Sequence, residues 1–337
     1  MAPSTAWKEV VAPDEGERFE RLANALKELQ TRAARDGRLG RAAHHKGQLG
    51  LEGEFEVLPD LPAEARVALF AAPAKYRAYV RVSNGSPSYQ SDRKPDVRGI
   101  AVKVVGVAGK KVIPGMQDAI TQDFLLIRSP TTGFRDSREF VSVVVGAASP
   151  PFGLLKAAAQ VGVGRLFRIL KRTLASFKIP MVSVATTRYF SAAPIRFGTY
   201  AVHFALTPHA RDDAGATPGT GPDYIADELS GRLRAGSVTW DFQVQFFVDD
   251  ERTPIEDGSV EWKAADAPFL TVARLTLPRQ DPDSEAGRAL ATRIESLSFD
   301  PWHALEDLRP LGDLMRARNV AYRVSTAARG AAPEPRE

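Results

Sequence analysis

Apolar residues recur along the chain with two different periods, and the two periods predict different elements. Over residues 14–36 they return every three or four positions, as at Phe19, Leu22 and Leu26, which predicts an exposed amphipathic helix. In LEGEFEVL, residues 51–58, they alternate with polar residues, which is typical of a half-buried strand. Similar alternation appears in YRAYVRVSNG, RGIAVKVVGV, GTYAVHFALT, TWDFQVQFFVDD and FLTVARLTL. Turn-forming residues separate these segments without a strand–helix–strand rhythm, so the pattern predicts an antiparallel sheet or barrel.

Two later segments predict helices of different character. Residues 153–177 contain five basic residues and no acidic residue. We interpret this segment as a surface helix packed on the barrel, and the alternative is a helix that lies on a membrane surface. Residues 313–330 predict a last helix, and the polar tail at 331–337 predicts disorder.

Composition adds a few constraints. The 337 residues include no cysteine, which excludes disulfides, zinc–thiolate sites and a cysteine nucleophile. The net charge of +4 is spread along the chain and does not indicate nucleic-acid binding. We expect a cytoplasmic protein, because the N-terminus has no apolar leader. The predicted organisation is a helical arm at 1–36 and one domain at 37–330, with the basic segment inserted at 153–178.

Two short motifs hold candidate catalytic side chains. RAAHHKG at 41–47 contains two adjacent histidines, His44 and His45. Either could act as a general base near neutral pH, and the alternative is that both are solvent-exposed residues of a polar turn. In the predicted strand that follows, Arg81 and Ser83 share one face. They could supply a cation for an anionic ligand and a hydroxyl that orients an imidazole.

The last predicted helix carries a polar stripe. Arg318, Tyr322, Ser325 and Arg329 follow at spacings of four, three and four, which places them on one face. Such a stripe can simply face solvent. A guanidinium one turn from a phenol also favours the phenolate, an anionic oxygen ligand that can hold ferric haem.

Taken in order, these motifs resemble those of the haem catalases. The chain has RAAHHKG, VRVS, DVRGIAVK, FDP and RNVAYRVSTAAR. Catalases have, in the same order, R-V-V-H-x-K-G, V-R-F-S, D-x-R-G-F-A-V-K, F-D-P and R-x-F-x-Y-x-D-T-x-x-x-R. The stretch GEFEV after the histidines also matches. The resemblance spans about residues 37–330 and fits the short, catalase-related branch of the family. It implies an α+β fold in which haem b, with its iron, is buried between an antiparallel β-barrel and the C-terminal helix.

The resemblance also implies roles on the distal side of the haem. His44 matches the distal histidine, Ser83 the serine that hydrogen-bonds it, and Phe140 the phenylalanine at the haem edge. His45 falls where catalases have a small residue. Ile127 stands where catalases have an asparagine that helps to hold peroxide, which implies weak or no catalase turnover.

On the proximal side, Tyr322 matches the iron ligand and Arg318 the arginine that keeps it ionised. Arg41, Arg81 and Arg329 match the arginines that pair with the haem propionates. We therefore expect a haem peroxidase that reduces hydrogen peroxide or organic hydroperoxides with a small organic electron donor, and that assembles as a homo-oligomer. The alternatives are a lipid hydroperoxide isomerase or lyase, served by membrane contact through 153–177, and a non-catalytic haem-binding protein.

Overall fold

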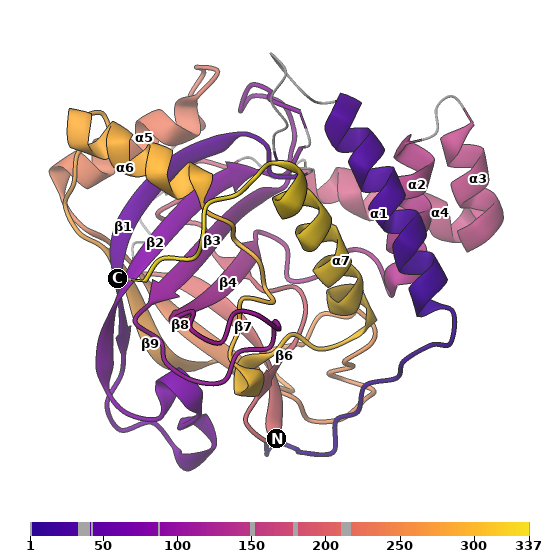
Figure 1. The fold of residues 1–337 in the computed structure, drawn as a ribbon, viewed down its shortest axis with the longest axis horizontal. Coiled ribbons are helices and arrows are strands. Elements are labelled where there is room, and N and C mark those ends of the chain that lie inside the picture. The colour runs from indigo at the N-terminus through magenta and orange to yellow at the C-terminus, as the bar shows by residue number, and fades with distance from the viewer. Residues whose placement is uncertain are drawn as a thin grey trace.

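The computed structural model is organised around a closed antiparallel β-barrel with a group of helices at one side (Figure 1). It describes residues 2–32, 41, 43–86, 88–148, 152–177, 181–209 and 217–336. Eight strands follow the order β5-β4-β3-β2-β1-β9-β8-β7, β5 pairs with β7 to close the ring, and β6 extends from β7. The strands are β1 (Gly47–Val57), β2 (Ala74–Asn84), β3 (Arg98–Val105), β4 (Thr121–Ile127), β5 (Tyr189–Phe190), β6 (Ile195–Phe197), β7 (Tyr200–Pro208), β8 (Val238–Phe246) and β9 (Leu270–Leu277). The predicted α+β fold with an antiparallel barrel is confirmed.

Aromatic rings fill the interior of the barrel. Phe55 of β1 lies 5.9 Å from Phe124 of β4 and 5.2 Å from Phe242 of β8, and the last two are 4.8 Å apart, measured between ring centroids. All three are buried, and each such side chain contributes roughly 1.5–3 kcal/mol when it leaves water. Because the interior is a packed core, a ligand has to bind outside the barrel wall.

The outer face of β2, β3 and β4 is buried as well as the inner face. In β2, Val80 and Val82 belong to the barrel core, while Arg81 and Ser83 alternate onto the outer face and are still 4% and 5% exposed. Helices cover this face, and α7 crosses in front of β3 and β4 (Figure 1). The polar residues that alternation places on this face are therefore enclosed between sheet and helix.

Seven α-helices lie in the described part of the chain. They are α1 (Glu15–Arg32), α2 (Ser137–Ala148), α3 (Gly153–Val161), α4 (Val163–Phe177), α5 (Tyr224–Ala235), α6 (Glu285–Ser296) and α7 (Asp313–Ala328). The helix predicted over 14–36 corresponds to α1. Its apolar face is not exposed, because Leu22 and Leu26 pack against Val141 of α2 and Ala317 of α7.

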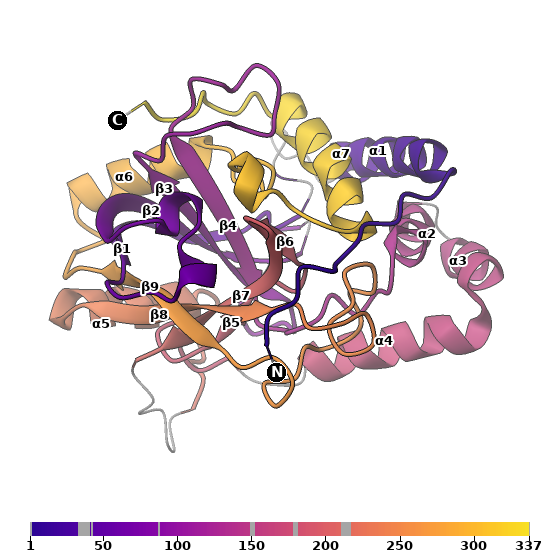
Figure 2. The same cartoon turned by 90° about the horizontal axis from the view of Figure 1, so that it is seen from below.

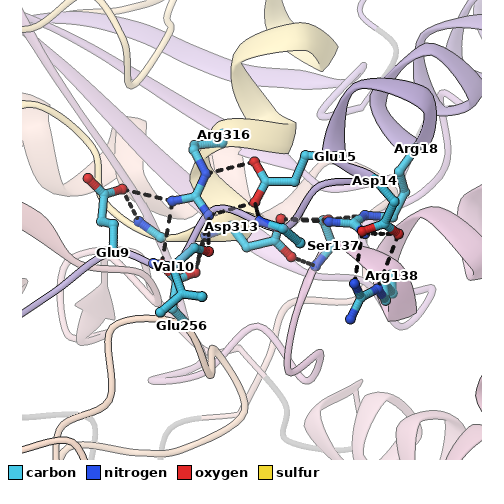
Figure 3. A network of polar contacts seen from close by, with 12 residues as sticks. Glu9, Val10, Asp14, Glu15, Arg18, Ser137, Arg138, Glu256, Asp313 and Arg316 are labelled. Atoms are coloured by element: carbon cyan, nitrogen blue, oxygen red, sulfur yellow. Dashed lines mark hydrogen bonds and ion pairs between the residues drawn. The ribbon is translucent and has the colours of Figure 1, made fainter.

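A polar network fixes the start of α7 against α1 and α2 (Figure 3). The carboxylate of Asp313 accepts hydrogen bonds from Arg18 Nη2 at 3.2 Å and from Ser137 Oγ at 2.8 Å. One turn later, Arg316 Nη2 lies 2.8 Å from Glu15 Oε1. These contacts set the position of α7, the helix that carries the predicted iron ligand.

The basic segment forms two helices rather than one. Gly162 separates α3 from α4 with φ of +84°, a conformation that glycine adopts without strain. α3 lies at the end of the molecule away from the barrel, and α4 runs from there back toward the barrel (Figure 2).

The composition predicts disorder over 331–337, and the described residues of this segment make specific contacts with the rest of the fold. Ala332 N donates to Ser296 O at 2.9 Å, and the carboxylate of Glu334 lies 2.6 Å from Lys103 Nζ. A buried lysine thus holds a tail whose composition alone indicated no fixed structure.

Candidate active site

A cavity of about 350 Å³ lies between the outer face of β2–β4 and the helices α1, α2 and α7. Most of the side chains around it are apolar. All eight residues predicted for the site line it: Arg41, His44, Arg81, Ser83, Phe140, Arg318, Tyr322 and Arg329. His45 is not among the lining residues. The structure therefore brings together side chains from the first and last thirds of the chain, with Phe140 from the middle third.

His44 is held in place through its backbone and its ring. Its φ of +55° lies in the left-handed region, which is uncommon for a side-chain-bearing residue. His44 N donates to Gly85 O at 3.0 Å, and Arg81 Nη2 donates to His44 O at 3.0 Å. The ring Nδ1 lies 2.9 Å from Ser83 Oγ. Contacts on all sides thus fix the orientation of the imidazole.

Two further features define the chemistry of this imidazole. A Cβ on Gly99 would lie 2.7 Å from His44 Cε1, so only glycine leaves the ring its present place. Burial first, and then the positive charges of Arg81 and Arg318, lower the pKa of His44 to about 3. The imidazole is therefore neutral at pH 7 and can accept a proton.

Across the cavity, α7 presents Tyr322. Arg318, one turn earlier, donates from Nη2 to Tyr322 Oη at 3.1 Å, which is the predicted partnership. Trp302 Nε1 donates to Met315 O at 2.8 Å and anchors the preceding turn. The phenol oxygen thus has one cationic donor, the arrangement that favours an anionic oxygen ligand for a metal.

Three guanidinium groups gather at one end of the cavity around a single carboxylate, a group that we call the arginine rim: Arg41, Arg81, Arg329 and Glu295. Arg81 Nε lies 2.7 Å from Glu295 Oε2, and Arg41 Nε lies 3.1 Å from Glu295 Oε1. Arg329 Nη2 donates instead to Leu297 O at 2.7 Å. The net formal charge of the arginine rim is 3 − 1 = +2.

Burial and the repulsion between neighbouring guanidinium groups lower the pKa values of two arginines of the rim. Burial, followed by repulsion from Arg81, lowers the pKa of Arg41 to about 9. Burial also lowers the pKa of Arg329. A cluster of this kind is stabilised by an added anion. Haem b carries two propionates and a flat apolar ring, so the arginine rim, the apolar walls and Tyr322 fit it.

Leu26 and Phe134 are among the lining residues that were not predicted as parts of the site. Leu26 reaches the cavity from α1, and Phe134 packs edge-on against Phe140 with 5.5 Å between ring centroids. Glu295 was also not predicted; it does not line the cavity but contacts the lining residues Arg41 and Arg81. Ile127 lines the cavity at the end of β4, and no Asn or Gln occurs among the described lining residues.

A second charged group lies outside the cavity, and we call it the buried ion cluster: Lys103, Asp123, His303 and Glu334. Lys103 Nζ lies 2.7 Å from Asp123 Oδ1 and 2.6 Å from Glu334 Oε2. His303 Nδ1 lies 3.0 Å from Glu334 Oε1. Asp123, His303 and Glu334 are close enough to hold a metal ion, but the lysine ammonium already contacts both carboxylates. We therefore assign a structural role to the buried ion cluster.

Comparison with known proteins agrees with this geometry. The chain is 30% identical over 303 residues to a catalase-related peroxidase of Mycolicibacterium paratuberculosis (strain ATCC BAA-968 / K-10), covering 86% of this chain and 88% of that protein. It superposes on the crystal structure of a fungal catalase with a TM-score of 0.63 at 17% identity, over 99% of this chain and 66%, just under two thirds, of the catalase. No protein-family profile matches the chain. The chain belongs to the catalase-related peroxidases and is an oxidoreductase of catalase-like fold.

Within the described ranges, no helix is both long and apolar enough to cross a bilayer.

Proposed function

We propose that the protein is a haem-dependent peroxidase that reduces hydrogen peroxide or organic hydroperoxides at the expense of a small organic donor. The observation that carries the proposal is that His44 and the Arg318–Tyr322 pair line one cavity whose end is formed by the arginine rim. Haem b, when bound, would supply an iron centre that activates the O–O bond of a peroxide. Tyr322 would ligate the iron, and Arg41, Arg81 and Arg329 would bind the propionates.

His44 moves the proton in this scheme. Its neutral ring would accept a proton from one oxygen of the peroxide and return it to the other, departing oxygen. Ser83 keeps the ring in the orientation that this transfer needs, because it holds Nδ1 at 2.9 Å. Overall, ROOH takes two electrons and two protons from the donor and leaves as ROH and water.

The cavity wall favours peroxidase over catalase turnover. Catalase turnover needs a second peroxide to be oriented as a reductant. Ile127 offers neither a donor nor an acceptor for that purpose, and the apolar walls suit an organic group. We therefore expect peroxidase turnover with an organic donor to exceed oxygen release from hydrogen peroxide.

The test combines haem binding with turnover. We expect haem-loaded wild type to show a Soret band and donor oxidation, Tyr322→Phe to lose high-affinity haem binding, and His44→Ala to keep haem but lose turnover by about 10²–10⁴-fold. Arg323→Ala, at an exposed position on the same helix, is the control. Unchanged haem affinity in Tyr322→Phe would contradict the assigned ligand, and unchanged turnover in His44→Ala would favour a non-catalytic haem-binding protein.

A second candidate is the rearrangement of lipid hydroperoxides. The observation in its favour is the apolar wall formed by Leu26, Phe134 and Phe140. Stopped-flow rates with hydrogen peroxide and with a fatty-acid hydroperoxide, each with and without donor, separate the two functions. An isomerase or lyase consumes the lipid hydroperoxide without donor, whereas a peroxidase needs the donor to turn over.

A further inference from the structure

The outer surface of α3 and α4 exposes large apolar side chains. Val163, Phe167 and Leu170 of α4 are 75%, 66% and 37% exposed, and Phe152 and Leu155 beside and in α3 are 63% and 68% exposed. Several large apolar side chains exposed on neighbouring helices are typical of a binding surface. At about 100° per residue, the three α4 side chains fall within roughly 60° of one another and form one stripe.

The rotation of α4 about its axis is fixed by contacts of side chains outside this stripe. Leu166 and Ile169 are 7% and 1% exposed and face the protein. Arg165 donates from Nε and Nη2 to the two carboxylate oxygens of Glu139 on α2, at 2.6 and 2.8 Å. Because these contacts orient the helix, the stripe of Val163, Phe167 and Leu170 stays on the outside. Both views place α3 and α4 on the side of the molecule that carries α1 and α2 (Figures 1 and 2).

Uncompensated positive charge flanks the stripe. Lys156, Arg168 and Lys171 are exposed, and no ion pair joins any of them to another described residue. No Asp or Glu occurs in the sequence between Glu139 and Asp212. An apolar stripe beside a purely cationic flank is complementary to the surface of an anionic bilayer, which offers acyl chains below and negative headgroups above.

We propose that the outer face of α3 and α4 docks the protein on anionic membrane surfaces, with Phe152, Leu155, Val163 and Phe167 inserted at the level of the upper acyl chains. Charge favours this occupant over a second copy of the chain, because a two-fold contact would set the same cations against each other. The face is one helix away from the cavity: Glu139 of α2 holds α4, and the next residue, Phe140, lines the cavity. The proposal does not depend on haem binding.

The experiment measures vesicle flotation of the full-length protein. We expect binding to vesicles of phosphatidylcholine with 30% phosphatidylserine, at least tenfold stronger than to phosphatidylcholine alone. Phe167→Ser should weaken binding at least tenfold, and the Arg168→Gln/Lys171→Gln double variant should remove the preference for the anionic lipid. Val11→Ser, at a side chain that is 67% exposed on the N-terminal segment, is the matched control.

Circular dichroism of each variant verifies the fold, since all the substituted side chains are exposed. Equal flotation of Phe167→Ser and Val11→Ser overturns the proposal, and so does a lack of binding to anionic vesicles. Sedimentation velocity provides the third outcome: a wild-type dimer that becomes a monomer in Phe167→Ser would show that a second copy covers this face, and the proposal would be wrong.

Discussion

The arginine rim and the buried ion cluster use similar side chains in opposite ways. The buried ion cluster sets Lys103 and protonated His303 against the carboxylates of Asp123 and Glu334, so its formal charge is 2 − 2 = 0. The arginine rim sets three guanidinium groups against one half-exposed carboxylate, with a surplus of +2. A balanced buried cluster holds segments of the chain together, whereas an unbalanced one is prepared for an anionic ligand. The same comparison predicts stability effects for one group and ligand-binding effects for the other.

The largest expected effect is on the buried ion cluster. Lys103→Met leaves the carboxylates of Asp123 and Glu334 buried without their cation, and we expect the free energy of unfolding to fall by about 3–5 kcal/mol. Urea denaturation measures it. The control is Lys75→Met on the neighbouring strand β2, because Lys75 pairs with Glu54 at 2.8 Å while 61% exposed, and its loss should cost far less. Similar effects of the two variants would contradict the contrast.

The second effect concerns the pH dependence of the buried ion cluster. Burial alone would lower the pKa of His303, but its contacts with Asp123 and Glu334 outweigh burial and raise it to about 9. A raised folded-state pKa stabilises the fold fully below about pH 6.5, the unfolded value, and that contribution disappears as the pH rises through 9. We expect wild type to lose on the order of 2–3 kcal/mol relative to His303→Gln between pH 6.5 and 9.5.

Denaturation curves of both proteins over this window provide the measurement. Lys111, whose pKa burial lowers to about 8, titrates in the same window in both proteins and largely cancels in the difference. Asp300, whose pKa burial raises to about 6, titrates mainly below it. A difference that is independent of pH would show that His303 is uncharged in the folded protein.

The sequence predicted the arginine rim better than the buried ion cluster. The arginines of the rim lie in short motifs with characteristic spacing, so resemblance could indicate them. Glu295 could not be assigned to them, because its partners Arg41 and Arg81 lie 254 and 214 residues away in the chain. Likewise, nothing in the tail composition indicates that Glu334 reaches Lys103.

The sequence pattern also predicted some elements of secondary structure and missed others. Alternation predicted β1, β2 and β3 because polar and apolar positions alternate regularly there. It did not reveal β4, whose sequence TQDFLLI carries the buried polar residues Gln122 and Asp123. The helix α2 was also missed, because the β-branched run in SREFVSVVVGAA is not typical of a helix. In both cases tertiary burial overrides the local pattern.

The third expected effect is on ligand binding by the arginine rim. Arg329→Met removes one of the three guanidinium groups, and we expect the affinity for haem to fall by about 10–100-fold, since a hydrogen bond to a charged group contributes about 1.5–3 kcal/mol. Unfolding of the haem-free protein should change little, because burial already lowers the pKa of this guanidinium. Titration followed at the Soret band gives the affinity, and Arg323→Met on the same helix is the control. A loss of stability without a loss of affinity would assign Arg329 to the fold rather than to the ligand.

The smallest effect provides the sharpest test of the imbalance. Glu295→Gln raises the surplus charge of the arginine rim from +2 to +3 and removes the carboxylate that contacts Arg41 and Arg81. We expect haem to bind up to about tenfold tighter, a gain of about 1.4 kcal/mol, while the haem-free protein becomes less stable. The gain should shrink at high salt, because Glu295 is 49% exposed and its charge is screened.

Glu285→Gln, at an exposed position in the first turn of the same helix, controls for the loss of a charge on α6. If Glu295→Gln bound haem more weakly than this control, the carboxylate would be an organiser of the guanidinium groups rather than a competitor for them. The arginine rim would then resemble the buried ion cluster in needing its carboxylate to stay assembled, and its surplus charge would not by itself explain ligand binding.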